Sequence, residues 1–74
     1  MDVQNLISMA NNIGQFFESM PDRQQALKDI AAHIKNFWDP RMRQALLSSL
    51  DSKEAEGLSA IVLEALLRHR DLLA

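Results

Sequence analysis

Apolar residues recur every three or four positions along most of the chain, and this helical period restricts the possible folds more than any other feature. The residues that most often break secondary structure are few: Gly14, Gly57, Pro21 and Pro40. No run of β-branched residues alternates with a period of two, as a half-buried strand would. The sequence therefore predicts an all-α fold, a compact array of about four short helices in one domain over residues 1–74.

The first two predicted helices cover residues 3–19 and 21–37. Asp2 is the expected N-cap of the first helix, and Pro21 is the expected first residue of the second, where a proline fits well. The apolar stripe of the first helix is Val3, Leu6, Ala10, Ile13, Phe17 and Met20. That of the second is Ala26, Leu27, Ile30, Ala31, Ile34 and Phe37. Each stripe predicts one buried helix face.

Two further helices are predicted over residues 40–50 and 59–70, with residues 51–57 as a polar loop between them. Asp39 followed by Pro40 is a typical helix start. The third helix is expected to bury Met42, Ala45, Leu46 and Leu50. Ser59 is the expected N-cap of the fourth helix, with Leu58 and Leu63 spaced for a hydrophobic staple around it.

The small size of the chain points to support from another surface. A domain of 74 residues buries only about 60–65% of its unfolded surface, so its core is marginal. It has no cysteine, which excludes disulfides and thiolate metal sites, and His33 and His69 lack a metal-ligand spacing. We therefore expect no metal and no cofactor. Association with another protein is the remaining source of support.

Charge and hydropathy exclude two classes of partner. The net charge of −2 and the pI near 5.5 argue against nucleic acid, whose binding proteins are usually basic. No apolar run approaches the roughly 20 residues of a membrane helix, and the N-terminus has no signal-peptide pattern. We expect a soluble, cytoplasmic protein.

Trp38, Arg41 and Arg43 surround the start of the third predicted helix. An arginine in a first turn opposes the helix dipole by about 0.3–1 kcal/mol, so two of them suggest an anionic or aromatic partner, inside the chain or outside it. One interpretation is that Trp38 closes the core while the arginines are solvated or paired locally. The other is an interface anchor, since tryptophan and arginine dominate binding hot spots.

Phe16, Phe17 and Gly14 also admit two interpretations each. Because Phe16 and Phe17 are adjacent, at most one can point straight into the core. We favour a wide core face shared among several helices; the alternative is that Phe16 belongs to an exposed patch covered by another subunit. Gly14, one turn after Ala10, forms a notch of small residues for a close backbone approach, most simply by a helix of the same chain.

Catalysis has little support in the sequence. Asp29 and His33 lie one helical turn apart, but no nucleophile or glycine-rich phosphate loop accompanies them. We therefore predict a binding protein, not an enzyme.

Four segments, in this order, resemble one known family: residues 9–17 (MANNIGQFF), 20–23 (MPDR), 30–34 (IAAHI) and 37–43 (FWDPRMR). They are similar to the small delta subunit of soluble NAD-dependent, molybdenum-containing formate dehydrogenases. The resemblance spans nearly the whole chain and is strongest over residues 9–50, and its most specific part is 37–43. The chain departs from the pattern at Ser59-Ala60, where an acidic residue and a proline would be expected.

The resemblance implies a non-catalytic accessory or maturation subunit that binds the large catalytic subunit of a formate dehydrogenase. The expected contact residues are Phe16, Phe17, Trp38, Arg41 and Arg43. One alternative is a chaperone that itself contacts the anionic molybdopterin dinucleotide, because arginines near a helix N-terminus suit phosphate. Another is a self-associating helical module, or a small helix-turn-helix protein that the acidic charge disfavours.

Overall fold

The computed structural model describes residues 2–74, and that part of the chain is helical and contains no strand. The observed elements confirm the predicted fold class. They are α1 (Val3–Phe17), α2 (Arg23–Phe37), α3 (Pro40–Ser49), the 3₁₀ helix η1 (Lys53–Gly57), α4 (Ala60–Arg68) and α5 (Arg70–Leu73).

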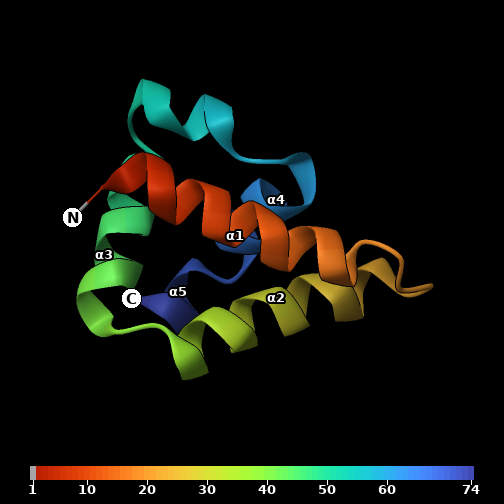
Figure 1. Cartoon of the computed structure of the whole chain (residues 1–74). Helices are drawn as coiled ribbons and strands as arrows, with labels where there is room; N and C mark the ends of the chain where they lie inside the picture. Colours follow the sequence, from red (N-terminus) through yellow and green to blue (C-terminus); the bar gives the residue numbers. More distant parts are fainter. Residues whose placement is uncertain (1) are drawn as a thin grey trace.

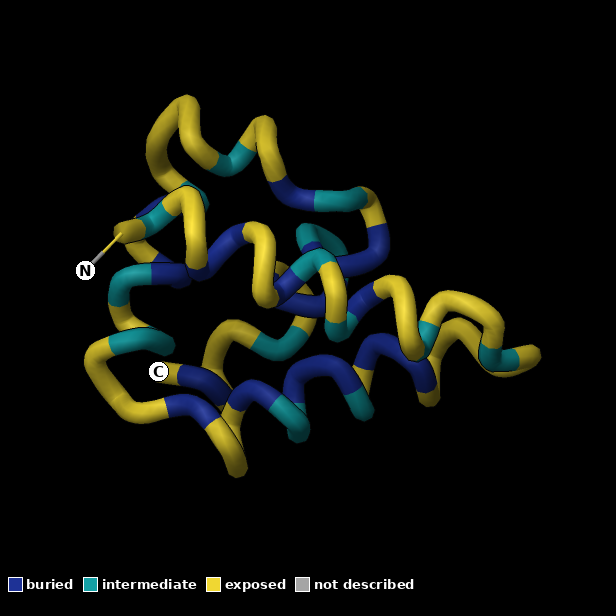
Figure 2. Tube along the Cα trace, in the orientation of Figure 1, coloured by how far each residue is buried: buried dark blue, intermediate teal, exposed yellow. Residues whose placement is uncertain are grey.

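Helices α1 and α2 form an antiparallel hairpin, and the other elements pack around it (Figure 1). Helix α3 packs across the N-terminal part of α1, and η1 lies along α1 on the side away from α2. Helix α4 lies behind the hairpin, where it packs against α2 and α1, and α5 returns along α2. The buried residues line the inner sides of these helices (Figure 2). The hairpin thus has its back covered by α4 and α5, and its front open.

The buried face of α1 is rotated relative to the predicted stripe. Its buried residues are Leu6, Ile7, Ala10 and Gly14, whereas Ile13 and Phe17 are only partly buried. The difference arises because α4 and η1 cover the side of α1 that carries Ile7 and Gly14. The stripe predicted for α2 holds except at Phe37, which is exposed.

Gly14 confirms the predicted notch, and the element that enters it is α4 of the same chain. A Cβ atom at Gly14 would lie 2.5 Å from Cγ2 of Val62 and 3.2 Å from Cγ2 of Ile61. Such a contact is closer than two carbon atoms can pack, so glycine is needed here for space. The cost of glycine in a helix, about 1 kcal/mol, is offset by this close packing of α4 on α1.

Aspartates cap the first three helices. The Gln4 amide donates to Asp2 Oδ1 (3.0 Å), and the Arg41 amide donates to Asp39 Oδ1 (2.7 Å). Both predicted caps are confirmed, as is Pro40 at the first turn of α3. The start of α2 differs by two residues: its first residue is Arg23, not Pro21, because Asp22 accepts from the Gln25 amide (3.3 Å) and is the N-cap.

The last third of the chain holds two further differences. Residues 53–57, predicted as loop, form η1, whose N-cap Ser52 accepts from the Glu54 amide. The fourth predicted helix is broken at His69 into α4 and α5, and this break lets Leu73 reach the core. Ser59 occupies the N-cap position of α4, but its side chain makes no capping hydrogen bond. Within residues 2–74, no helix has the length and apolar character needed to cross a membrane.

Candidate protein interface

Trp38 lies in the core, with 7% of its surface exposed. It follows α2 directly, and its amide still donates to the Ile34 carbonyl (3.0 Å), which holds the residue against the end of that helix. This burial agrees with the interpretation in which Trp38 closes the core. We call Trp38 and the Arg43 side chain that packs over it the Trp38 corner.

Arg43 has its partners within the chain. Its Nη1 donates to the carbonyl oxygens of Lys35 (3.1 Å) and Trp38 (3.2 Å), at the C-terminal end of α2. A positive charge is favourable there, because the carbonyls at the end of a helix carry the negative pole of its dipole. The guanidinium therefore stabilises the end of α2 although it opposes the dipole of α3. Arg41 is exposed to solvent.

Phe16 and Phe37 are exposed, with 76% and 75% of their surfaces open to solvent. The favoured interpretation of Phe16, a shared core face, is therefore wrong, and so is the placement of Phe37 in the core. Both belong to adjacent aromatic pairs, Phe16-Phe17 and Phe37-Trp38, and in each pair only one side chain turns inward. Phe37 is next to Trp38, so the argument that adjacent residues cannot both point into the core holds for this pair as it does for Phe16 and Phe17.

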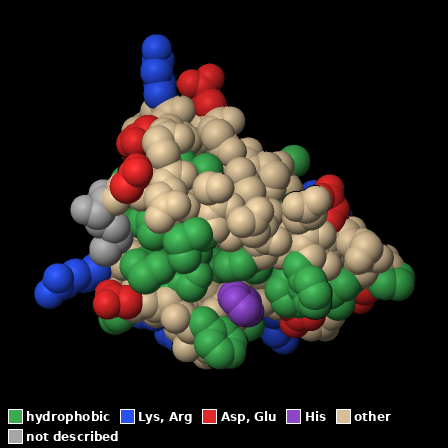
Figure 3. All heavy atoms as spheres, viewed as in Figure 1, with side chains coloured by type: hydrophobic (Ala, Val, Ile, Leu, Met, Phe, Trp, Pro, Cys, Tyr) green, Lys and Arg blue, Asp and Glu red, His purple; other side chains and the backbone are tan. Residues whose placement is uncertain are grey.

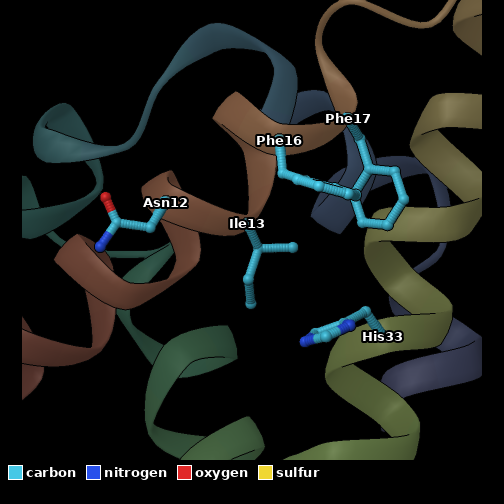
Figure 4. Close-up of a pocket in the computed structure, with 5 residues that line it drawn as sticks. All are labelled: Asn12, Ile13, Phe16, Phe17 and His33. Atoms are coloured by element: carbon cyan, nitrogen blue, oxygen red, sulfur yellow. The ribbon is translucent and has the colours of Figure 1, made fainter.

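The exposed rings of Phe16 and Phe37 and the partly buried rings of Phe17 and His33 form a continuous row across α1 and α2. Phe16 and Phe17 meet edge to face (ring centroids 5.1 Å apart), Phe17 lies 6.5 Å from His33, and His33 lies 4.8 Å from Phe37. Ile13, Phe17 and His33 turn toward the space between the two helices, and together with Asn12 and Phe16 they line an open hollow of about 350 Å³ (Figure 4). We call the surface formed by this row, Ile13 and the exposed Met9 the aromatic face.

Helix α1 contributes no charge to this surface. From Val3 to Phe17 it contains no Asp, Glu, Lys or Arg, although 24% of the whole chain is charged. Its exposed positions are Gln4, Asn5, Ser8, Met9, Asn12, Gln15 and Phe16. Figure 3 shows this front as largely uncharged surface with apolar patches, a histidine side chain among them in purple, and the acidic and basic groups mainly around its edges. Depletion of charge together with aromatic enrichment is the composition of interface cores.

The opposite side of α1 is closed by hydrogen bonds that sequence reasoning missed. The Asn11 Nδ2 donates to the Gly57 carbonyl (2.9 Å), and the Ser59 amide donates to Asn11 Oδ1 (2.9 Å). One amide side chain thus fixes the joint between η1 and α4. The only signal of this role in the sequence is a polar residue, Asn11, directly after Ala10 of the buried stripe.

The residues considered for catalysis or phosphate binding have structural partners. Asp29 Oδ1 accepts from Gln25 Nε2 (2.9 Å), and the His33 ring lies between Phe17 and Phe37. At the N-terminus of α3, the Arg41 amide, which a bound phosphate would need as a donor, already donates a hydrogen bond to Asp39. In residues 2–74, no group of three or more His, Asp or Glu side chains is arranged to hold a metal ion.

The fold and this surface define a small all-helical protein that presents an exposed, uncharged aromatic face. Comparison with protein families identifies the family: the chain matches the NADH-dependent formate dehydrogenase delta subunit FdsD over residues 5–66, and it belongs to that family. The match confirms the resemblance drawn from residues 9–43. Comparisons with curated proteins and with solved structures found no match.

Proposed function

We propose that this chain is a non-catalytic accessory subunit that binds the large catalytic subunit of an NAD-dependent formate dehydrogenase and supports its assembly or stability. The observation that carries the proposal is the aromatic face, which leaves Phe16 and Phe37 three-quarters exposed on a chain of the delta subunit family. A small protein that exposes adjacent large aromatic side chains gains free energy when another surface covers them. Binding only the folded large subunit would stabilise that subunit by mass action.

The proposed contacts are Phe16 and Phe17, with Phe37 and His33 added to them. Arg41 stays among them because it is exposed and follows Phe37 by only four residues in the sequence. Contact of another subunit with Trp38 or Arg43 also stays a prediction. Their burial and internal hydrogen bonds support a role in holding the end of α2 beneath Phe37.

Co-purification from the native cell tests this function. A tagged chain is expected to retain the large subunit of formate dehydrogenase, and Phe16→Ser with Phe37→Ser is expected to reduce its yield by at least about tenfold, as loss of hot-spot residues does. Leu67→Ser is the matched control, because Leu67 is also exposed (56%) but lies on α4, outside the aromatic face.

One further measurement completes the test. Cells that lack the chain are expected to accumulate less folded large subunit, measured by immunoblot after limited proteolysis. A wild-type chain that retains no formate dehydrogenase subunit, or a large subunit equally abundant and protease-resistant without the chain, would contradict the proposal.

A further inference from the structure

On the side of α2 that carries His33, the nearest charged residue is Asp29. Asp29 precedes His33 by one turn of α2, so it lies on the same side of that helix. Lys28 and Lys35 lie about 140° and 160° around the helix axis from His33, on a different side of α2. The chain has no Lys or Arg from residue 2 to residue 22, which includes all of α1. The remaining cation of α2, Arg23, is paired with Glu64 of α4 (2.8 Å). Asp29 is therefore a carboxylate on the His33 side of α2, and the cations of α2 lie on other sides or are already paired.

The shape of the surface suits a helix better than an extended segment. The backbone groups along α1 and α2 are engaged in their own helical hydrogen bonds, so a strand would find no ladder to join. The hollow between two packed helices is instead the place where a third helix inserts its side chains. Helix binding in such grooves relies on apolar anchors at successive turns.

Resting on the function proposed above, we propose that the aromatic face seats an amphipathic helix of the partner subunit, whose apolar side fills the hollow and whose Lys or Arg pairs with Asp29. The hollow takes one large apolar side chain against Ile13, Phe17 and His33. The exposed ring of Phe16 covers a second apolar side chain of the bound helix. The cation of that helix lies beside Asp29, one turn before His33 in α2. Asp29 is only partly buried, so the pair contributes more to orientation and selectivity than to affinity.

A second copy of this chain fits the face less well. Its own aromatic face would bring another Asp29 and an uncharged α1. Its exposed Leu67 and Leu72 stand beside Arg68 and Arg70, but this surface differs from the aromatic face, so the two could meet only in a head-to-tail contact. Such a head-to-tail contact would also leave a free face at each end and propagate.

Amide NMR of the full chain tests the occupant with two synthetic peptides of about four helical turns. Both carry leucines at i, i+3, i+4 and i+7; one has Lys and the other Glu at the remaining positions. The Leu/Lys peptide is expected to shift amides within residues 12–17 and 29–37 and to bind at least about fivefold more tightly than the Leu/Glu peptide. Asp29→Asn is expected to weaken Leu/Lys binding about two- to fivefold.

Glu56→Gln is the matched control for general attraction to an acidic protein, because Glu56 is exposed on η1, on the far side of α1. It is expected to leave Leu/Lys binding unchanged. Equal binding of the two peptides, equal effects of the two variants, or shifts confined to other helices would overturn the proposal. So would association of the chain with itself that Phe16→Ser abolishes.

Competition separates this proposal from the function on which it rests. The Leu/Lys peptide is expected to displace formate dehydrogenase subunits from the tagged chain. If the subunits bind, are lost in the Phe16→Ser, Phe37→Ser variant, but are not displaced, the helix proposal fails and the function stands. If no subunit binds while the peptide does, the function fails instead.

Discussion

The Trp38 corner and the aromatic face are built from similar residues, but the fold closes the first and leaves the second open. Trp38 and Phe37 are neighbours in sequence, and their exposed fractions are 7% and 75%. The difference follows from the end of α2: the helix ends at Phe37, which stays on the helix surface, and Trp38 is in an extended conformation (φ −91°, ψ 142°) that leads the chain into α3 and places its ring in the core. Adjacent aromatic residues therefore divide into one that stabilises the fold and one available for binding.

The same contrast applies to the two arginines of α3. Arg43 neutralises the negative end of α2 through two carbonyl oxygens, whereas Arg41 is exposed and has only its backbone amide bound by the cap. A pair of arginines in a first turn thus had two separate explanations. For Arg43 the partner is internal, the end of a neighbouring helix; an external partner for Arg41 stays a prediction.

The largest expected effect separates the two neighbours Trp38 and Phe37. Trp38→Ala is expected to lower the free energy of unfolding by about 3–5 kcal/mol, because it removes a large buried ring and leaves a cavity. Phe37→Ala is expected to lower it by less than about 1 kcal/mol, since only its contact with His33 is lost. Urea unfolding followed by circular dichroism measures both free energies. Equal losses for the two variants would contradict the distinction between a buried Trp38 corner and an exposed aromatic face.

A smaller effect is expected for the arginines. Arg43→Met is expected to cost about 1–2 kcal/mol of unfolding free energy, because the carbonyls of Lys35 and Trp38 lose a charged donor. Arg41→Met, the matched control, is expected to change it by no more than about 0.5 kcal/mol. Thermal unfolding at low and high salt checks the pair; a larger loss for Arg41→Met would mean that its exposed side chain stabilises the fold.

The smallest effect on stability is expected on the aromatic face itself. Serine and phenylalanine have similar helix propensities, so Phe16→Ser combined with Phe37→Ser is expected to change the unfolding free energy by less than about 1 kcal/mol. The same double variant is expected to reduce binding of a hydrophobic dye, because it removes two exposed rings. Leu67→Ser, on α4, serves as the control. A loss of several kcal/mol would place the aromatic face in the core.

Sequence reasoning succeeded where one local cause decides the structure. The Asp2 and Asp39 caps and Pro40 depend on hydrogen bonds and backbone angles within one turn, and they appear as predicted. The notch at Gly14 was also predicted, because a glycine inside a strong helix pattern needs a packing reason. Family membership followed from short segments whose order and residues are specific.

The failures share a different cause, which is a choice between two locally acceptable arrangements. Pro21 and Asp22 both suit a helix start, and the capping hydrogen bond to Gln25 selected Asp22. The polar segment 53–57 forms a 3₁₀ helix because it packs on α1, which its own sequence does not indicate. Ile7 lies outside the predicted stripe but is buried, and Phe37 lies in a predicted stripe but is exposed, because the positions of η1 and α4 decide which side of the hairpin is covered.

Helical period, caps and composition were enough to specify a small all-α protein without disulfides, because these depend on interactions between residues close together in the chain. Which of two adjacent aromatic residues faces solvent, and which arginine finds a partner, depended on contacts between segments that the sequence separates. Arg43 meets the end of α2, and Asn11 meets a backbone more than 40 residues away, only once the helices have packed. The uncharged, aromatic front of the α1–α2 hairpin is likewise a product of that packing, since α4 and α5 cover only its back.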